Sequence, residues 1–441
     1  MKMRWVVGLI VWAVVSTGVV RAQESQAPLT LEESIKIATQ KSLTLNIATQ
    51  GVAGSEFRRK EAITSFLPTW VGNYGWNRSN QPILLGVSQG VLVTGGGSTP
   101  SKDIFNFSTS LNQPVFTGGL NSANYRFAKL GVDLSKAGVE TAKLDLVLQV
   151  TVGYFTILRA EKFLAVAEQQ VKNFEAQLEV TKAFFDVGIV PKNDVLQAEV
   201  QLANAKQNQV KAGNDLAAAK ASFNTLLVRE VNTPFEVVDI LAYKAFPLSF
   251  EQSLEEAIQL RPEIKAAQLN IDQAKENVKI ARSGFFPTVN LTAGYTRSSD
   301  DLDLSGGGNF NNQWQVGASA SFTLWNWGKT AFQVGENKVK VSQAEDSKTQ
   351  LVLSITLAVK DDYLNMLAAE KNIGTAEKAV EQAEENMRMF EERYRYQVAT
   401  QTDVLIAVTL VAQARTNYYG ALSDFNVAKA QLERDMGKMY P

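Results

Sequence analysis

The chain has 441 residues, 45% of them hydrophobic and 20% charged, and its 44 basic residues nearly balance its 45 acidic ones. This composition favours neither a disordered chain nor a multi-span helical membrane protein, and it offers no basic surface for nucleic acid. The chain contains no His and no Cys, which excludes disulfides, Cys/His zinc sites, iron–sulfur clusters and any mechanism that needs an imidazole or a thiolate. Carboxylate pairs such as Asp361-Asp362 are consecutive helical residues that do not face each other, so we interpret them as a solvated face and expect no enzyme, metal or cofactor.

The first residues resemble a targeting segment. Lys2 and Arg4 precede an apolar run over residues 5–15, and Val20-Arg21-Ala22 suits a cleavage site. We therefore predict a secretory signal peptide that is cleaved after Ala22. An uncleaved membrane anchor is the alternative, although the apolar run is short for a full span.

The rest of the chain is an internal duplication. A shift of 219 residues places 29–79 on 248–298 without a gap, and farther along a shift of 209 places Ala160-Glu161-Lys162 on Ala369-Glu370-Lys371. The change in shift indicates a longer Gly-rich loop in the first half. The predicted division is a signal peptide at 1–22, a first repeat at 23–228, an inter-repeat linker at 229–247 and a second repeat at 248–441.

Each repeat begins with a predicted helix, at about 31–65 and 251–284, that ends just before Pro68 or Pro287. Period-two alternation of apolar and polar residues then takes over and predicts two strands in each repeat. The four predicted strands are 67–79, 104–116, 286–298 and 313–325.

The predicted strands have one apolar, aromatic face and one face of small, uncharged polar residues. Their length of about ten residues suits tilted membrane strands. We expect the lipid-facing residues to be Trp70, Tyr74, Trp76, Phe105, Phe107, Tyr295, Trp314, Val316 and Phe322. A soluble β-sandwich would show the same alternation. Because the smallest membrane barrels have about eight strands, four strands cannot close one, and several chains would have to share it.

The remaining segments read as very long helices, at about 119–187, 191–228, 328–396 and 400–436. Apolar residues recur twice in every seven, which is typical of a coiled-coil seam. The seam of the second repeat consists of Val404, Ala407, Val411, Ala414, Tyr418, Ala421, Phe425, Ala428 and Leu432. A soluble rod would have this seam as well, but it would not need strands between its helices. We predict tight helix–helix connections at 188–193 and 397–402.

Together these features resemble the TolC-like outer-membrane efflux protein family, over about residues 29–437. The motifs that carry the resemblance are Leu29-Thr30-Leu31-Glu32-Glu33-Ser34, Pro114-Val115-Phe116-Thr117-Gly118-Gly119, Arg282-Ser283-Gly284-Phe285-Phe286-Pro287, and the stretch Val187 to Leu196 with its repeat partner Asp403-Val404-Leu405.

The resemblance implies an α+β membrane protein that forms a homotrimer. Three chains of four β-strands would build a twelve-stranded barrel in outer-membrane lipid, and the long coiled-coil helices would continue it as a periplasmic α-barrel. The expected function is the passive exit duct of a tripartite efflux or type I secretion system in a Gram-negative bacterium. The expected partners are a periplasmic adaptor and an inner-membrane transporter. The alternative function is a periplasmic coiled-coil scaffold with a small β-domain.

The resemblance also assigns roles at the periplasmic end. Asp403 matches an acid that lines the family's aperture, Asp194 is its first-repeat equivalent, and Thr400 and Thr402 lie beside Asp403. Thr400-x-x-Asp403 is equally typical of a helix capping box, and the two roles are compatible. A second acid of the family motif is replaced here by Ile406. The residues expected to contact the adaptor are Gly188, Ile189, Val190, Val398 and Ala399.

Overall fold

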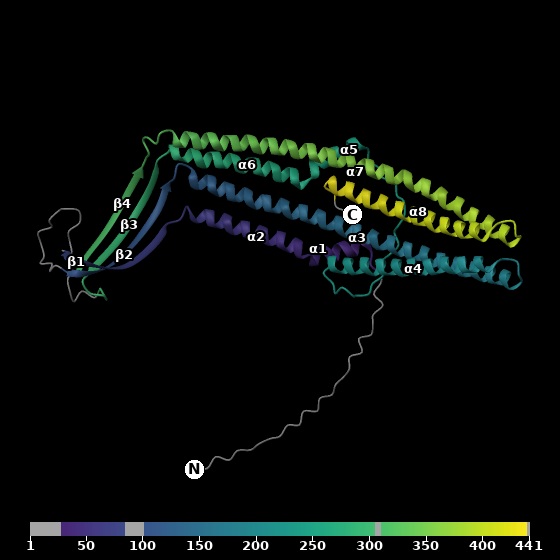
Figure 1. The fold of residues 1–441 in the computed structure, drawn as a ribbon. Coiled ribbons are helices and arrows are strands. Elements are labelled where there is room, and N and C mark those ends of the chain that lie inside the picture. Colours follow the sequence, from purple (N-terminus) through teal and green to yellow (C-terminus); the bar gives the residue numbers. More distant parts are fainter. Residues whose placement is uncertain (1–27, 84–100, 305–309, 439–441) are drawn as a thin grey trace, which may run out of the picture.

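The computed structural model describes residues 28–83, 101–304 and 310–438. The predicted signal peptide, its cleavage site after Ala22 and both Gly-rich loops lie outside these ranges. The molecule is elongated (Figure 1). A β-sheet lies at one end, the two connections between long helices lie at the other end, and the helices run between them.

The same order of elements occurs twice, as the duplication predicts. The first repeat consists of α1 (Leu31–Lys41), α2 (Leu43–Thr64), β1 (Thr69–Ile83), β2 (Ser101–Phe116), α3 (Leu120–Asp186) and α4 (Lys192–Leu226). The second repeat consists of α5 (Phe250–Leu260), α6 (Pro262–Arg282), a 3-10 turn η1 (Ser283–Phe285), β3 (Thr288–Ser299), β4 (Phe310–Ser321), α7 (Lys329–Arg395) and α8 (Gln401–Asp435).

The opening helix of each repeat is broken, so the prediction of continuous helices over 31–65 and 251–284 is wrong. The first break is at Ser42, whose hydroxyl accepts a hydrogen bond from the Leu45 amide at 3.3 Å and caps α2. The second break is at Arg261, which adopts an extended conformation before Pro262. Ser42 and Arg261 are equivalent under the shift of 219 residues, so both repeats turn at the same place.

The four strands form one antiparallel sheet in the order β1-β2-β3-β4. Residues directly opposite each other in such a sheet share a face. The register pairs Trp70 with Leu111, Tyr74 with Phe107, Trp76 with Phe105, Thr109 with Tyr295, Tyr295 with Trp314 and Ala293 with Val316. The predicted apolar residues within the strands therefore lie on a single face.

The opposite face is polar. The row Asn73, Ser108, Thr296 and Gln313 crosses the whole sheet, and the row Val71, Ser110, Gly294 and Gln315 lies beside it.

The last strand is shifted from its predicted position of 313–325. β3 and β4 first pair at Thr288 and Ser321, because Pro287 has no amide hydrogen with which to extend the ladder. Phe322 consequently lies just beyond β4, where it is exposed. The segment after β4 also contains Trp325 and Trp327, which are exposed and whose rings pack edge to face.

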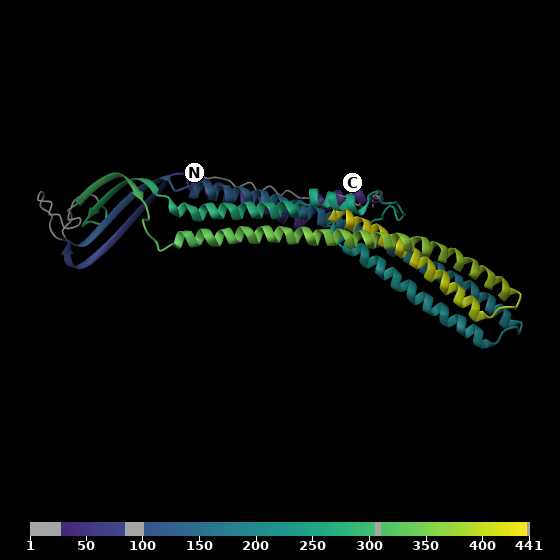
Figure 2. The same cartoon turned by 90° about the horizontal axis from the view of Figure 1, so that it is seen from above.

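The helices nearest the sheet follow the order of the strands. α2 packs on α3, α3 on α6 and α6 on α7, so a layer α2-α3-α6-α7 continues the layer β1-β2-β3-β4 (Figure 1). In the far half, α4 packs along α3 and α8 along α7, and Figure 2 shows the bundle changing direction near its middle. Buried seam residues hold these pairs together, as the heptad pattern predicts: Val195, Ala198, Ala205 and Phe223 in α4, and Val404, Ala407, Val411 and Phe425 in α8.

One helix of the described residues, α3, is apolar enough along part of its length to cross a membrane. Half of that apolar window is buried inside the protein. A core helix passes the same test, and the buried Tyr154, Phe155 and Leu158 lie in a cluster with Leu31 of α1 and Phe223 of α4.

Candidate functional site at the helical tips

The first tip connects α3 to α4 through a tight turn. Gly188 has φ of 78°, in the left-handed region that glycine adopts without steric cost. The Gly188 amide donates to the Phe185 carbonyl at 2.9 Å, and the Ile189 amide donates to the Phe184 carbonyl at 2.8 Å. These bonds close the end of α3 as a C-cap, and Pro191 then precedes the first residue of α4.

The second tip repeats this turn without a glycine. Gln397 occupies the left-handed position with φ of 60°. Its amide donates to the Tyr394 carbonyl at 2.9 Å, and the Val398 amide donates to the Arg393 carbonyl at 2.8 Å. The predicted connections at 188–193 and 397–402 are thus the same structure, although only the first has the residue type that the turn prefers.

Both tips present apolar side chains to solvent. Ile189 and Val398 are exposed, whereas Val190 and Ala399 are half-buried. Sequence reasoning missed two neighbours that are more exposed than these residues, Val187 at 69% and Tyr396 at 81%. Exposed apolar groups of this kind at the end of a rod are typical of an interaction site.

Asp403 forms a complete capping box with Thr400, as its spacing predicts. The Thr400 amide donates to Asp403 Oδ2 at 2.8 Å, and the Asp403 amide donates to Thr400 Oγ1 at 3.3 Å. The Thr400 hydroxyl also donates to Asp403 Oδ2 at 2.7 Å. The Thr400 hydroxyl and amide together hold the pKa of the half-buried Asp403 carboxyl below its usual range, so Asp403 carries a negative charge at the tip.

Asp194 occupies the equivalent first turn of α4 but does not take part in a capping box. The residue before α4 is Pro191, which provides no side-chain hydrogen bond. The half-buried Asp194 therefore contributes charge near the positive end of the helix dipole rather than a cap. The two acids are equivalent in sequence and differ in structural role.

Polar contacts connect the two repeats near the tips. Gln197 of α4 and Thr402 of α8 approach within hydrogen-bonding distance, with Gln197 Nε2 donating to Thr402 Oγ1 at 3.3 Å. Deeper in the bundle, Gln177 Nε2 and Thr181 Oγ1 of α3 donate to Oε1 of Gln401 of α8 at 2.7 and 2.9 Å. All three residues of this second group are buried.

Sequence reasoning missed the Gln177–Thr181–Gln401 group, because Gln401 is more than two hundred positions away from the other two residues in the chain. The only local signal is that Gln177 and Thr181 are one helical turn apart, which is common for solvated residues. Tyr394 lies beside the group, its ring centroid 5.5 Å from that of Phe184, and burial raises the pKa of its hydroxyl. These polar contacts join the α7–α8 pair to α3 beside the apolar cluster that includes Phe174 of α3 and Val404 of α8.

The model of the protein family described as outer membrane efflux protein matches residues 35–227 and 253–438. The outer membrane efflux protein BepC of Brucella suis is 22% identical over 436 residues, which cover 98% of this chain and 90% of that protein. The outer membrane protein TolC of Vibrio cholerae is 26% identical over 298 residues, covering 67% of this chain and 68% of that protein. Among solved structures, the outer membrane protein VceC of Vibrio cholerae matches with a TM-score of 0.76 at 18% identity, covering 93% of this chain and 97% of the other.

Proposed function

Because the chain belongs to the outer membrane efflux protein family, we propose that it is the exit duct of a tripartite efflux or type I secretion system. In this proposal three copies form a passive conduit through the outer membrane and the periplasm, after removal of the signal peptide behind Ala22. Its partners are a periplasmic adaptor and an inner-membrane transporter, and the transporter supplies the energy.

The observation that carries the proposal is that the sheet continues into the helix layer α2-α3-α6-α7 and that, in the described part of the chain, both layers end in unpaired edges. Among the described residues, β1 and β4 each pair on one side only, and proteins seldom leave long edge strands unpaired. Four strands are too few to close a barrel, whereas three copies joined from β4 to β1 supply twelve. The helix layer α2-α3-α6-α7 would close in the same rotation.

The two outer helices of that layer have apolar stripes that no other described segment of the chain covers. The exposed residues are Leu43, Ile47 and Phe57 on α2, and Phe332, Val339, Leu353, Leu357 and Leu364 on α7. Spacings of seven residues, such as Phe332 to Val339 and Leu357 to Leu364, keep a stripe on one side of a helix. We propose that α7 of one copy packs against α2 of the next.

The sheet fits a membrane passage in both of its faces. We propose that Trp70, Trp314 and their neighbours on the aromatic face meet lipid. The opposite rows consist of Asn, Ser, Thr, Gln, Gly and Val residues without a charge. Such a surface suits a water-filled lumen that passes solutes of different charge.

The tips are the proposed periplasmic entrance. We propose that Asp403, Asp194, Thr400 and Thr402 line its aperture and that Gly188, Ile189, Val190, Val398 and Ala399 contact the adaptor. The depressed pKa of Asp403 supports a negative entrance at neutral pH. With Ile406 in place of a second acid, the expected preference for cations rests on Asp403 and Asp194.

Planar-bilayer recording of the purified full-length protein tests this function. We expect stable current steps with a modest cation preference, and we expect Asp403→Asn to reduce that preference while leaving the trimer intact. Glu381→Gln, at an exposed position of α7, is the matched control and should leave the selectivity unchanged. A soluble product that never conducts would contradict the duct and favour the scaffold alternative.

A further inference from the structure

The prediction that Asp361-Asp362 forms a solvated face is wrong for Asp362. Asp362 lies on α7 and is half-buried. Its Oδ2 atom is shielded from solvent and has no hydrogen-bond donor within the part of the chain that the structure describes. A buried carboxylate oxygen without a donor is costly, because it has lost its water and gained no replacement.

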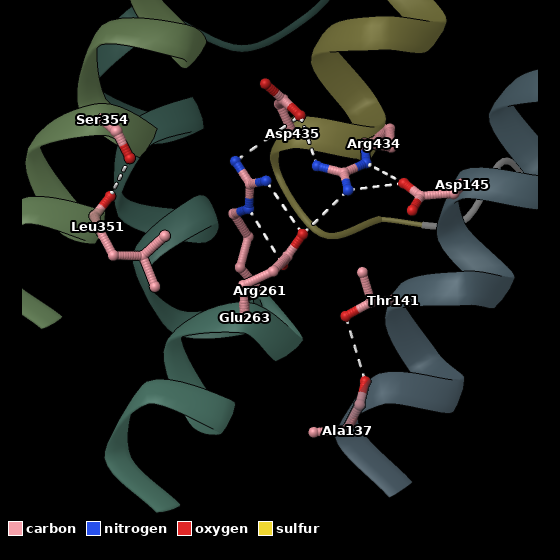
Figure 3. Close-up of polar contacts among 9 residues, drawn as sticks. All are labelled: Ala137, Thr141, Asp145, Arg261, Glu263, Leu351, Ser354, Arg434 and Asp435. Atoms are coloured by element: carbon pink, nitrogen blue, oxygen red, sulfur yellow. Dashed lines mark hydrogen bonds and ion pairs between the residues drawn. The ribbon is translucent and has the colours of Figure 1, made fainter. Parts of the chain in front are cut away.

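Asp362 neighbours Asp435 and Arg261, which belong to a cluster of charged side chains. Figure 3 shows the two guanidinium groups of this cluster, those of Arg261 and Arg434. Arg261 contacts Glu263 at 3.1 Å and Asp435 at 3.7 Å. Arg434 contacts Asp145 at 2.6 Å, Glu263 at 3.0 Å and Asp435 at 2.9 Å. The cluster therefore joins α3, the α5–α6 corner and the end of α8.

Local backbone structure brings these elements together. Arg261 adopts an extended conformation at the break before Pro262, and its side chain is buried. After α8, Gly437 turns with φ of 74° and lies directly against the α5–α6 corner. A Cβ atom at Gly437 would lie only 2.9 Å from the Leu260 carbonyl carbon, so the chain end is fitted closely to the corner.

The charges in the cluster do not balance. The acids Asp145, Glu263, Asp362 and Asp435 face two bases, Arg261 and Arg434, while Asp361 adds a further negative charge beside Asp362. Burial raises the pKa of Asp362 to about 7, and the neighbouring Asp435 and Asp361 carboxylates act in the same direction while Arg261 opposes them. Two carboxylates that share a buried site hold one proton between them more readily than they hold two charges.

The first repeat shows that the fold does not require charge at this position. The shift of 209 residues places Asp362 on Gly153 and Asp435 on Leu226. A Cβ atom at Gly153 would contact the side chains of Phe223 and Leu226, at 2.9 and 3.7 Å. The equivalent site is thus apolar and tightly packed in one repeat, whereas it is acidic with an unsatisfied oxygen in the other.

We propose that Asp362 and Asp435 share a proton that fastens the middle of α7 to the end of α8 and to the α5–α6 corner. Loss of this proton leaves two negative charges side by side in a half-buried site and loosens the junction. The inference rests on the geometry within one chain and is independent of what the duct carries.

The direction of the pH dependence follows from linkage. Asp362 binds its proton more tightly in the folded protein, with a pKa of about 7, than at the ordinary value of 3.8. Its favourable contribution to folding is therefore complete below the ordinary value and is lost as the pH rises through about 7. This is opposite to an acid in a salt bridge, which stabilises above its ordinary pKa.

Thermal unfolding of the full-length protein in detergent, followed between about pH 5 and about pH 9, tests the proposal. We expect the wild-type midpoint to fall by several degrees as the pH rises through 7. Asp362→Asn should remove most of this fall, because the amide is neutral throughout. Glu381→Gln, an exposed acid on the same helix, should retain the wild-type profile.

Infrared spectroscopy of the wild-type protein gives a second test that does not depend on a variant folding. We expect the carbonyl stretch of a protonated carboxylic acid near neutral pH, its disappearance at alkaline pH, and its absence from Asp362→Asn and from Asp435→Asn. No such band in the wild type near neutral pH, or the same midpoint profile in Asp362→Asn as in the wild type, would overturn the shared proton.

Discussion

Gln397 shows whether the turn at a tip requires a glycine at the position with positive φ. A residue with a Cβ atom pays about 1–2 kcal/mol to adopt the left-handed region, yet the two hydrogen bonds of the turn are the same at Gln397 as at Gly188. The turn is therefore imposed by the helices on either side. The absence of a glycine at the second tip therefore adds strain without changing the shape of the turn.

Gln397→Gly is accordingly expected to stabilise the α7–α8 pair by about 1 kcal/mol. Equilibrium unfolding of the purified protein measures the change. Gly188→Gln at the other tip is the reciprocal variant and should destabilise by a similar amount. If both substitutions have the same sign, backbone strain does not govern these turns.

Each strand places alternate residues on the aromatic face and on the polar face of the sheet, and the pairing register shows to which face each residue belongs. Val316 lies opposite Ala293 on the aromatic face, and Ser319 lies opposite Asn290 on the polar face. Both residues are far enough into β4 to be within the proposed membrane span. They differ chiefly in which side of the sheet they occupy.

Val316→Arg should therefore cost about 2–4 kcal/mol in a bilayer, because the charge would enter hydrocarbon. Ser319→Arg should be tolerated, since it would face water in the lumen. Unfolding by urea in lipid vesicles compares the two variants. Equal tolerance would place both residues in water and argue against the proposed faces.

At the scale of elements, most of the fold could be predicted because its signals are periodic and occur twice. The seam of Val404, Val411 and Phe425 repeats every seven residues, and the strand faces alternate every two, so a local pattern specifies each element. The break at Ser42 was missed because a serine among apolar residues at helical spacing is also typical of a solvated position inside a continuous helix.

Contacts between distant elements could not be predicted in this way. Gln401 is bonded to Gln177 and Thr181 only because α8 lies on α3, and Asp362 is half-buried because Asp435 at the end of α8 lies beside it. The capping box of Thr400 and Asp403 was foreseen because its partners are three residues apart. Sequence reasoning therefore identified structure formed between neighbouring residues, such as this capping box, and missed contacts formed across the repeats.

In the proposed assembly, each copy is one segment of a closed ring and meets its neighbours through the apolar edges on α2 and α7. Long exposed apolar edges of this kind are typical of surfaces that a partner covers. Leu353 and Leu357 lie one turn apart near the centre of the α7 stripe and are both more than half exposed in a single chain.

Leu353→Glu combined with Leu357→Glu should abolish the trimer, because burying unpaired carboxylates costs several kcal/mol for each. Light scattering of the detergent-solubilised protein after size-exclusion chromatography measures the assembly. Ser347→Glu, exposed on another side of α7, is the control and should leave the mass unchanged. A trimer that survives the double substitution would place the interface elsewhere.

The length of α7 gives the charged cluster a mechanical meaning. The helix has 67 residues, which corresponds to about 100 Å, and Asp362 lies half-way along it. A long helix held at its centre acts as a lever with two arms of equal length. A tilt of about 3° around such a fulcrum would carry the sheet end and the tip end about 2–3 Å in opposite directions. Protonation of Asp362 near the centre of α7 would then cause its largest displacements at the sheet and at the tips, the two ends farthest from it.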